Sequence, residues 1–134
     1  MAIKRMTKGD MPRSLGTYNP VGHVLVALPN DALAQEARQA LRDIGFDEED
    51  LLLYTADEEN AQMEHMLAHA SQLSGFGYEV TLMRRYQALA REGCGWLLVY
   101  APDAPHAERV TEVARRFGAR SAVKYHWLAV EDLL

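Results

Sequence analysis

Cysteine is almost absent from these 134 residues, since Cys94 is the only one. An internal disulfide bond is therefore impossible, and scarce cysteine is typical of proteins from reducing compartments. Long apolar runs are missing as well, because none approaches the roughly 20 residues that a membrane-spanning helix needs. Residues 1–16 are basic but lack the apolar stretch of a secretory signal. We therefore expect a cytoplasmic protein that makes no contact with a membrane.

Catalytic signatures are also missing. The five histidines are scattered, and no serine–histidine–aspartate order with an oxyanion-hole glycine motif can be assembled from the sequence. The stretch SGFGY at 74–78 follows no strand, whereas a phosphate loop needs a strand, a glycine turn and then a helix. These absences predict a protein that is not an enzyme and that has no cofactor.

Positive charge is scarce in the middle of the chain. Residues 23–80 carry two basic and twelve acidic side chains, a net charge of −10, whereas residues 1–22 carry +3 and residues 81–134 carry +2. An acidic total of −5 without a basic stripe interleaved with aromatic residues argues against a nucleic-acid partner. The asymmetry fits either two poles that recognise each other in an oligomer or charge that only solvates the surface.

A repeated pattern organises the rest of the chain. VLVAL at 24–28 and LLVYA at 97–101 are typical of buried strands, and each leads through a proline-containing turn into an amphipathic helix. Each helix ends at a glycine, Gly45 or Gly118, where a left-handed cap is favoured. Shifting the sequence by 73 residues aligns six identical residues over positions 24–45. The spacing indicates a duplicated unit.

Two βαβ halves follow from this pattern. We expect a flexible basic arm at 1–22 and a single α+β domain at 23–134, with a ferredoxin-like sheet that carries helices on one face. The domain divides into a first βαβ unit at 23–55, a helical insertion at 56–93 and a second βαβ unit at 94–134. The closing strands are predicted at 51–55 and, as one continuous strand, at 121–130. The first helix places five apolar residues on one face: Leu33, Ala37, Ala40, Leu41 and Ile44.

The insertion predicts two helices, one at about 57–73 with Asp57 as its N-cap and one at about 79–92. The inner strands are apolar at every position and not at every second one, which indicates burial on both faces of the sheet. The repeated helices cover one face. The other face must be covered either by the inserted helices or by a second subunit.

The stretch EHMLAH at 64–69 places His65 and His69 four residues apart, a spacing that helical metal sites often use. Residues of a helix turn by about 100° each, so both histidines lie opposite the apolar stripe formed by Met63, Met66 and Leu67. Zinc needs three or four ligands, and this helix offers two. We therefore predict no metal site, while a site completed by another segment or subunit stays open.

Two further candidates have a structural and a chemical interpretation. Cys94 lies between two glycines without a histidine nearby, so a small apolar packing role is favoured over catalysis. Arg84 and Arg91 lie within about 20° of each other on the second inserted helix. They form either an anion contact or, together with Arg85, a set of surface arginines that pair with the acidic half.

The first half, HVLVALPNDALAQEARQALRDIGFDEEDLLL, resembles the bacterial general-stress domain called the YflT-type or heat-induced stress protein domain. The segments VYAPDAPHAERVTEVARRFGA and KYHWLAVEDL are similar to the return unit of such proteins. The likeness covers roughly 23–55 and 95–133. Relatives often carry a glycine-zipper segment where this chain has an amphipathic, charged insertion. The family has no established catalytic residues, so the resemblance implies none here.

Three functions are compatible with the sequence. We expect a soluble, non-enzymatic domain that acts through protein association, as a homodimer, in the general stress response. The alternative is a sensor of a small ligand or a metal, with its site at a homodimer interface. An enzyme that uses His65 and His69 with the inserted arginines ranks last.

Overall fold

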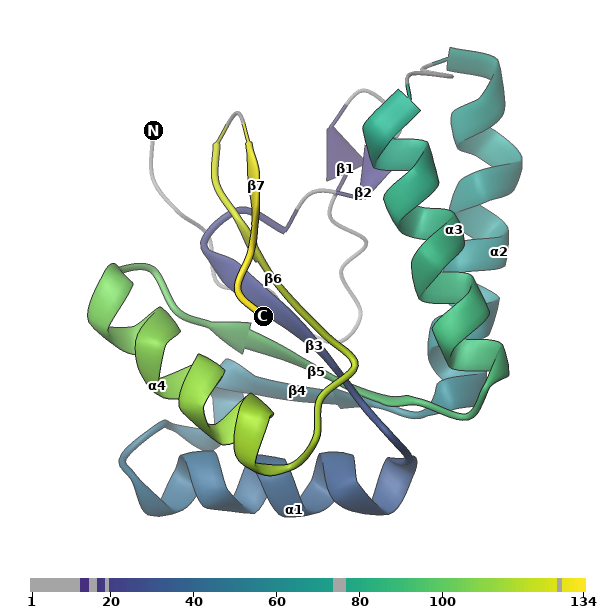
Figure 1. Ribbon diagram of the computed structural model, residues 1–134. Coiled ribbons are helices and arrows are strands. Elements are labelled where there is room, and N and C mark those ends of the chain that lie inside the picture. Colours follow the sequence, from purple (N-terminus) through teal and green to yellow (C-terminus); the bar gives the residue numbers. More distant parts are fainter. Residues whose placement is uncertain (1–12, 15–16, 19, 74–76, 128) are drawn as a thin grey trace.

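The computed structural model describes residues 13–14, 17–18, 20–73, 77–127 and 129–134. Figure 1 shows the arrangement of its helices and strands. In chain order these are β1 (Arg13–Ser14), β2 (Thr17–Tyr18), β3 (His23–Leu28), α1 (Asp31–Asp43), the 3-10 turn η1 (Glu48–Asp50), β4 (Leu51–Tyr54), α2 (Ala56–Leu73), α3 (Gly77–Arg91), β5 (Gly95–Tyr100), α4 (Ala104–Arg116), β6 (Ser121–Tyr125) and β7 (Val130–Asp132).

The main sheet has the strand order β4-β5-β3-β6-β7, and every neighbouring pair is antiparallel. β3 and β4 are therefore parallel to each other with β5 between them, and β5 and β6 are parallel with β3 between them. Each βαβ segment thus straddles a strand of the other. The predicted α+β class is confirmed.

The helices cover both faces of this sheet. α1 and α4 lie on one face, whereas α2 and α3 stand together on the other (Figure 1). Successive residues of a strand point to opposite faces. Val24 and Val26 of β3 accordingly pack beneath α1 and α4, while Leu25 and Ala27 pack beneath α2 and α3. The expectation that the second face is covered is confirmed, and the inserted helices provide the cover.

Both inserted helices turn an apolar stripe toward the sheet, although Leu67 of the stripe predicted for the first one is only partly buried. Met63 and Met66 of α2 are fully buried, and α3 contributes Leu82, Met83, Tyr86, Leu89 and Ala90. The Tyr86 ring meets Trp96 of β5 edge-on, with 5.5 Å between ring centroids. Its hydroxyl lies 2.6 Å from the hydroxyl of Tyr125 in β6. These contacts join the insertion to the centre of the sheet.

The ends of the helices follow local chemistry. Asn30 caps α1, because its Oδ1 accepts a hydrogen bond of 2.8 Å from the Leu33 amide. Gly45 and Gly118 follow α1 and α4 with φ of 108° and 73°, a region that favours glycine, as predicted.

The predicted N-cap of α2, Asp57, is wrong. Thr55 occupies that position, and its Oγ1 accepts from the Glu58 amide at 3.1 Å. Glu58 Oε1 in turn accepts from the Thr55 amide at 2.9 Å. This reciprocal pair is a capping box, so the helix begins at Ala56.

The predicted single strand at 121–130 is also wrong. β6 ends at Tyr125, and the chain reverses so that the His126 amide donates to the Ala129 carbonyl at 2.8 Å. β7 then pairs back onto β6 and adds a fifth strand to the sheet. Ile44, which was expected on the buried face of the first helix, is 47% exposed, because α1 ends at Asp43 before the chain turns.

The arm at 1–22 lies mostly outside the described residues. Within it, β1 and β2 pair antiparallel, with Arg13 opposite Tyr18. Figure 1 draws this pair beside α2 and α3, and β2 contacts both helices.

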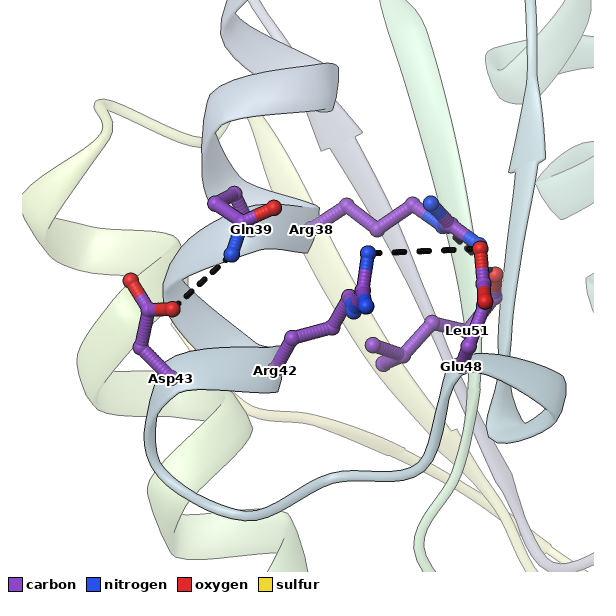
Figure 2. A network of polar contacts seen from close by, with 6 residues as sticks. All are labelled: Arg38, Gln39, Arg42, Asp43, Glu48 and Leu51. Atoms are coloured by element: carbon purple, nitrogen blue, oxygen red, sulfur yellow. Dashed lines mark hydrogen bonds and ion pairs between the residues drawn. The ribbon is translucent and has the colours of Figure 1, made fainter.

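Polar contacts join α1 to the start of β4 (Figure 2). Arg38 Nη2 lies 3.2 Å and Arg42 Nη1 lies 4.0 Å from Glu48 Oε1, and Arg38 Nε donates to the Leu51 carbonyl at 3.0 Å. Glu48 is largely exposed, so these ion pairs orient the segment more than they stabilise it.

Candidate ligand-binding pocket

Lys124 in β6 is the most unusual residue of the described sheet. It lies opposite Val24, which belongs to the apolar layer beneath α1 and α4. Residues directly opposite each other in an antiparallel pair share a face, so Lys124 points into the same layer. Its side chain is buried, with the residue only 5% exposed, whereas lysine is almost never buried without a partner.

The environment of Lys124 disfavours its charge. Its Nζ donates a hydrogen bond to the carbonyl of Ala101, at the end of β5. Burial lowers the pKa of its ammonium group, and the carboxylates of Asp103 and Glu131 partly oppose that effect. Among the described residues, no carboxylate forms an ion pair with this ammonium group.

A cavity of about 440 Å³ opens beside Lys124, between α4 and the β6–β7 hairpin. One wall is a single stripe of α4, since its residues follow the spacing of helix neighbours. That stripe comprises Ala104, Ala107, Glu108, Thr111, Glu112 and Arg115. The opposite wall comprises Lys124, His126, Glu131 and Leu133, and the loop before α4 adds Pro102 and Asp103.

The two carboxylates that act on Lys124 each contact a histidine. Asp103 Oδ1 lies 2.6 Å from His106 Nδ1 and accepts from the His106 amide at 2.9 Å, which caps α4. These bonds, the backbone one first, lower the pKa of Asp103. Glu131 Oε1 lies 2.9 Å from His126 Nε2 across the hairpin. Both acids are thus held by histidines, and within the described ranges no carboxylate directly contacts the ammonium group of Lys124.

A second, smaller cavity of about 250 Å³ lies on the other side of the start of α4. Pro102 lines both cavities. His106 and Arg109 line the smaller one, where the His106 ring meets Phe46 edge-on at 5.7 Å between centroids. The charged residues that line it, Asp47, Asp50 and Arg109, are exposed or partly exposed, whereas Lys124 is buried, so the larger cavity is the stronger candidate for a site.

The residues singled out from the sequence do not converge. His65 is exposed on α2, and the side chain of His69 lies outside the described part of the structure. α2 lies on the sheet face opposite the Lys124 cavity. Within the described ranges, no group of three or more histidine, cysteine, aspartate or glutamate side chains is placed to hold a metal ion.

The other candidates lie apart as well. Cys94 is fully buried beneath the inserted helices, and burial raises the pKa of its thiol. Arg84 and Arg91 are exposed on α3. Arg85 Nη2 donates to the carbonyl of Arg120 at 3.4 Å.

Comparison with known proteins finds no matching family, and no curated protein and no solved structure is significantly similar to the chain. In the described part of the chain, no helix combines the length and apolar character needed to cross a membrane.

The sequence contains a weak signal for Lys124. The lysine interrupts the apolar run SAVKY, in which Ala122 faces α1 and α4. Alternation along the strand places Lys124 on that same face. Because the sequence predicts one continuous strand to residue 130, it does not reveal the β6–β7 hairpin, which forms the other wall of the cavity beside Lys124.

Proposed function

We propose that this protein is a small-ligand-binding domain whose site is the cavity beside Lys124. The buried ammonium group carries the proposal. A lysine has three N–H donors, and the Ala101 carbonyl accepts one of them. Burying a charge is costly unless it is paired, and lysines perturbed in this way are typical of binding and catalytic sites. An anionic group of a ligand would supply the missing counter-charge.

The cavity suits a small ligand. Its volume of about 440 Å³ lies within the range of roughly 300–1,000 Å³ that is usual for ligand sites. Its walls combine apolar groups, such as Ala107 and Leu133, with polar and charged side chains, such as Thr111 and Lys124. This mixture supplies both burial of the ligand and its orientation.

Thermal unfolding with a panel of small carboxylates tests the proposal. A ligand at about one hundred times its dissociation constant should raise the melting temperature by about 8 °C for a domain of this size. Lys124→Met should abolish the shift, because it removes the cation and keeps the apolar stem. Arg109→Met is the matched control, since Arg109 is exposed on α4 and lines only the smaller cavity. An equal shift in wild type and Lys124→Met would exclude this site.

The fold class that we propose is ferredoxin-like with one added strand. Two interleaved βαβ segments in the order β4-β5-β3-β6 support it, since a ferredoxin-like sheet is a split βαβ arrangement. β7 then extends the sheet beyond β6. A crystal structure whose sheet had another strand order would contradict this assignment.

Association as a homodimer, a non-enzymatic role and membership of the YflT-type general-stress domain stay predictions. The ligand site that we propose lies within one chain and needs no second subunit. Light scattering at micromolar concentration tests the dimer directly, and a monomeric mass would exclude it.

A further inference from the structure

We infer that the cavity beside Lys124 takes a small ω-amino carboxylate, with the carboxylate at Lys124 and the amino group at Glu108 and Glu112. The inference rests on the proposed function. It follows from the charges of the cavity walls and from which of them already have partners.

The lining of the cavity is acidic. Four carboxylates, of Asp103, Glu108, Glu112 and Glu131, line it together with two cations, Arg115 and Lys124. A simple anion would be attracted by Lys124 and repelled by the four carboxylates. A simple cation would meet the opposite problem at Lys124. A ligand that carries both charges avoids each repulsion.

Apart from Lys124, three of these six charged groups already have a side-chain partner or a backbone hydrogen bond that occupies them. Asp103 contacts His106, Glu131 contacts His126, and Arg115 Nη2 donates to the Leu133 carbonyl at 3.2 Å. Among the described residues, neither Glu108 nor Glu112 takes part in an ion pair or a side-chain hydrogen bond. The groups left for a ligand are therefore one buried cation and two carboxylates.

The helix separates these two kinds of group. The ammonium group of Lys124 donates to the carbonyl of Ala101, two residues before Asp103, the N-cap of α4, so it lies at the N-terminal end of the cavity. Glu108 and Glu112 follow five and nine residues later, which is roughly 7 and 13 Å along the helix axis. Their carboxylates can fold back toward the cavity, yet the separation favours a ligand with several carbons between its charges over an α-amino acid.

The preference for a ligand with two separated charges is measured with three matched probes: 5-aminovalerate, valerate and pentylamine. Chemical-shift titrations of ¹⁵N-labelled protein should place 5-aminovalerate at the amides around Thr111 and Lys124. We expect it to bind at least about fivefold more tightly than either single-charge probe, since two partly exposed ion pairs contribute modestly. Glycine, with its charges close together, should bind more weakly than 5-aminovalerate.

Two variants separate the two ends of the ligand. The double variant Glu108→Gln/Glu112→Gln should lower the affinity for 5-aminovalerate to the level of the affinity for valerate. It should leave the affinity for valerate unchanged. Lys124→Met should weaken the binding of both 5-aminovalerate and valerate. Glu36→Gln, an exposed change on α1, should alter neither.

The outcomes distinguish this inference from the proposed function. Equal binding of valerate and 5-aminovalerate, lost from both in Lys124→Met, would overturn the ω-amino class and support an anion site. Binding of glycine or of pentylamine that is tighter than the binding of 5-aminovalerate would also overturn the inference. No shift at the cavity with any of the four probes would count against both.

Discussion

Glu59 of α2 provides a test of how the inserted helices are held against the sheet. It is 1% exposed and faces the apolar layer, and its Oε2 has no hydrogen-bond partner among the described residues. The indole Nε1 of Trp96, buried in the same layer, also has none there. Burial raises the pKa of Glu59 from 4.5 to about 8, so the side chain is protonated at neutral pH. Glu59→Gln should therefore keep the shape of the neutral acid and remove its titration.

The magnitude follows from proton linkage. The unfolded chain ionises Glu59 above pH 4.5, whereas the folded protein keeps it protonated until about pH 8. A raised pKa of an acid gives stability that is complete below 4.5 and is lost as pH rises toward 8. Each pH unit in this window costs 1.36 kcal/mol. At pH 7 the wild type has lost about 3 kcal/mol that Glu59→Gln does not lose.

Urea unfolding between pH 5 and pH 8.5 measures this difference. The free energy of unfolding of Glu59→Gln should exceed that of the wild type by about 1 kcal/mol near pH 5.5 and by about 3 kcal/mol at pH 7. Glu64→Gln is the matched control, because Glu64 is exposed on the same helix. It should follow the pH dependence of the wild type.

Two results would refute the reasoning. If Glu59→Gln and the wild type lose stability in parallel from pH 5 to pH 8.5, Glu59 does not titrate in this window. If Glu59→Gln is the less stable protein at pH 7, the carboxylate is ionised and paired within the folded protein. Either result would mean that burial does not control this group.

Three further substitutions test local features. Gly95→Ala would place a Cβ 2.7 Å from the backbone Cα of Asp31, so urea unfolding should show a loss of about 2 kcal/mol; an unchanged midpoint would show that α1 can move away from β5. Thr55→Ala removes the capping box of α2 and should lower the free energy of unfolding by about 1 kcal/mol. Thr81→Ala is the control, since Thr81 is exposed on α3, and it should leave the free energy of unfolding unchanged. Equal losses of stability in the two variants would contradict the capping role of Thr55. Lys124→Met should raise the stability of the ligand-free protein by about 1 kcal/mol near neutral pH. Because the pKa of Lys124 is lowered in the folded protein, its charge destabilises the fold at low pH, and this destabilisation disappears as pH rises toward 10.5. The stability advantage of Lys124→Met over the wild type should therefore shrink as pH rises toward 10.5. If Lys124→Met were less stable than the wild type at neutral pH, the charge of Lys124 would not be uncompensated.

Much of the fold follows from local patterns. The apolar runs at 24–28 and 97–101 became β3 and β5, and the helices before Gly45 and Gly118 formed as predicted. The errors fell at positions where two local signals compete. Asp57 is a good N-cap residue, but Thr55 with Glu58 makes two hydrogen bonds where Asp57 would make one. The segment after Tyr125 has strand-forming residues, yet it turns because its backbone pairs with β6 instead of extending.

The candidate site was much less predictable. His65 and His69 attract attention because metal ligands have a recognisable spacing, whereas a lysine in a strand carries no motif. Lys124 becomes notable only once burial, the Ala101 carbonyl and the facing stripe of α4 are known together. The burial of Glu59 is equally hard to predict, because nothing in the sequence distinguishes this glutamate from the others in the acidic α2 helix.

The sequence by itself determined where most helices and strands form and that both faces of the sheet must be covered. Those properties depend on propensity, periodicity and capping, which act over a few residues along the chain. The tertiary structure alone decided the strand order, the extra strand β7, and the identity of the cover as α2 and α3. It also decided which charged side chains are buried. Lys124 and Glu59 differ from exposed residues of their kinds because of the layers packed on them, and those layers come from segments distant in the chain.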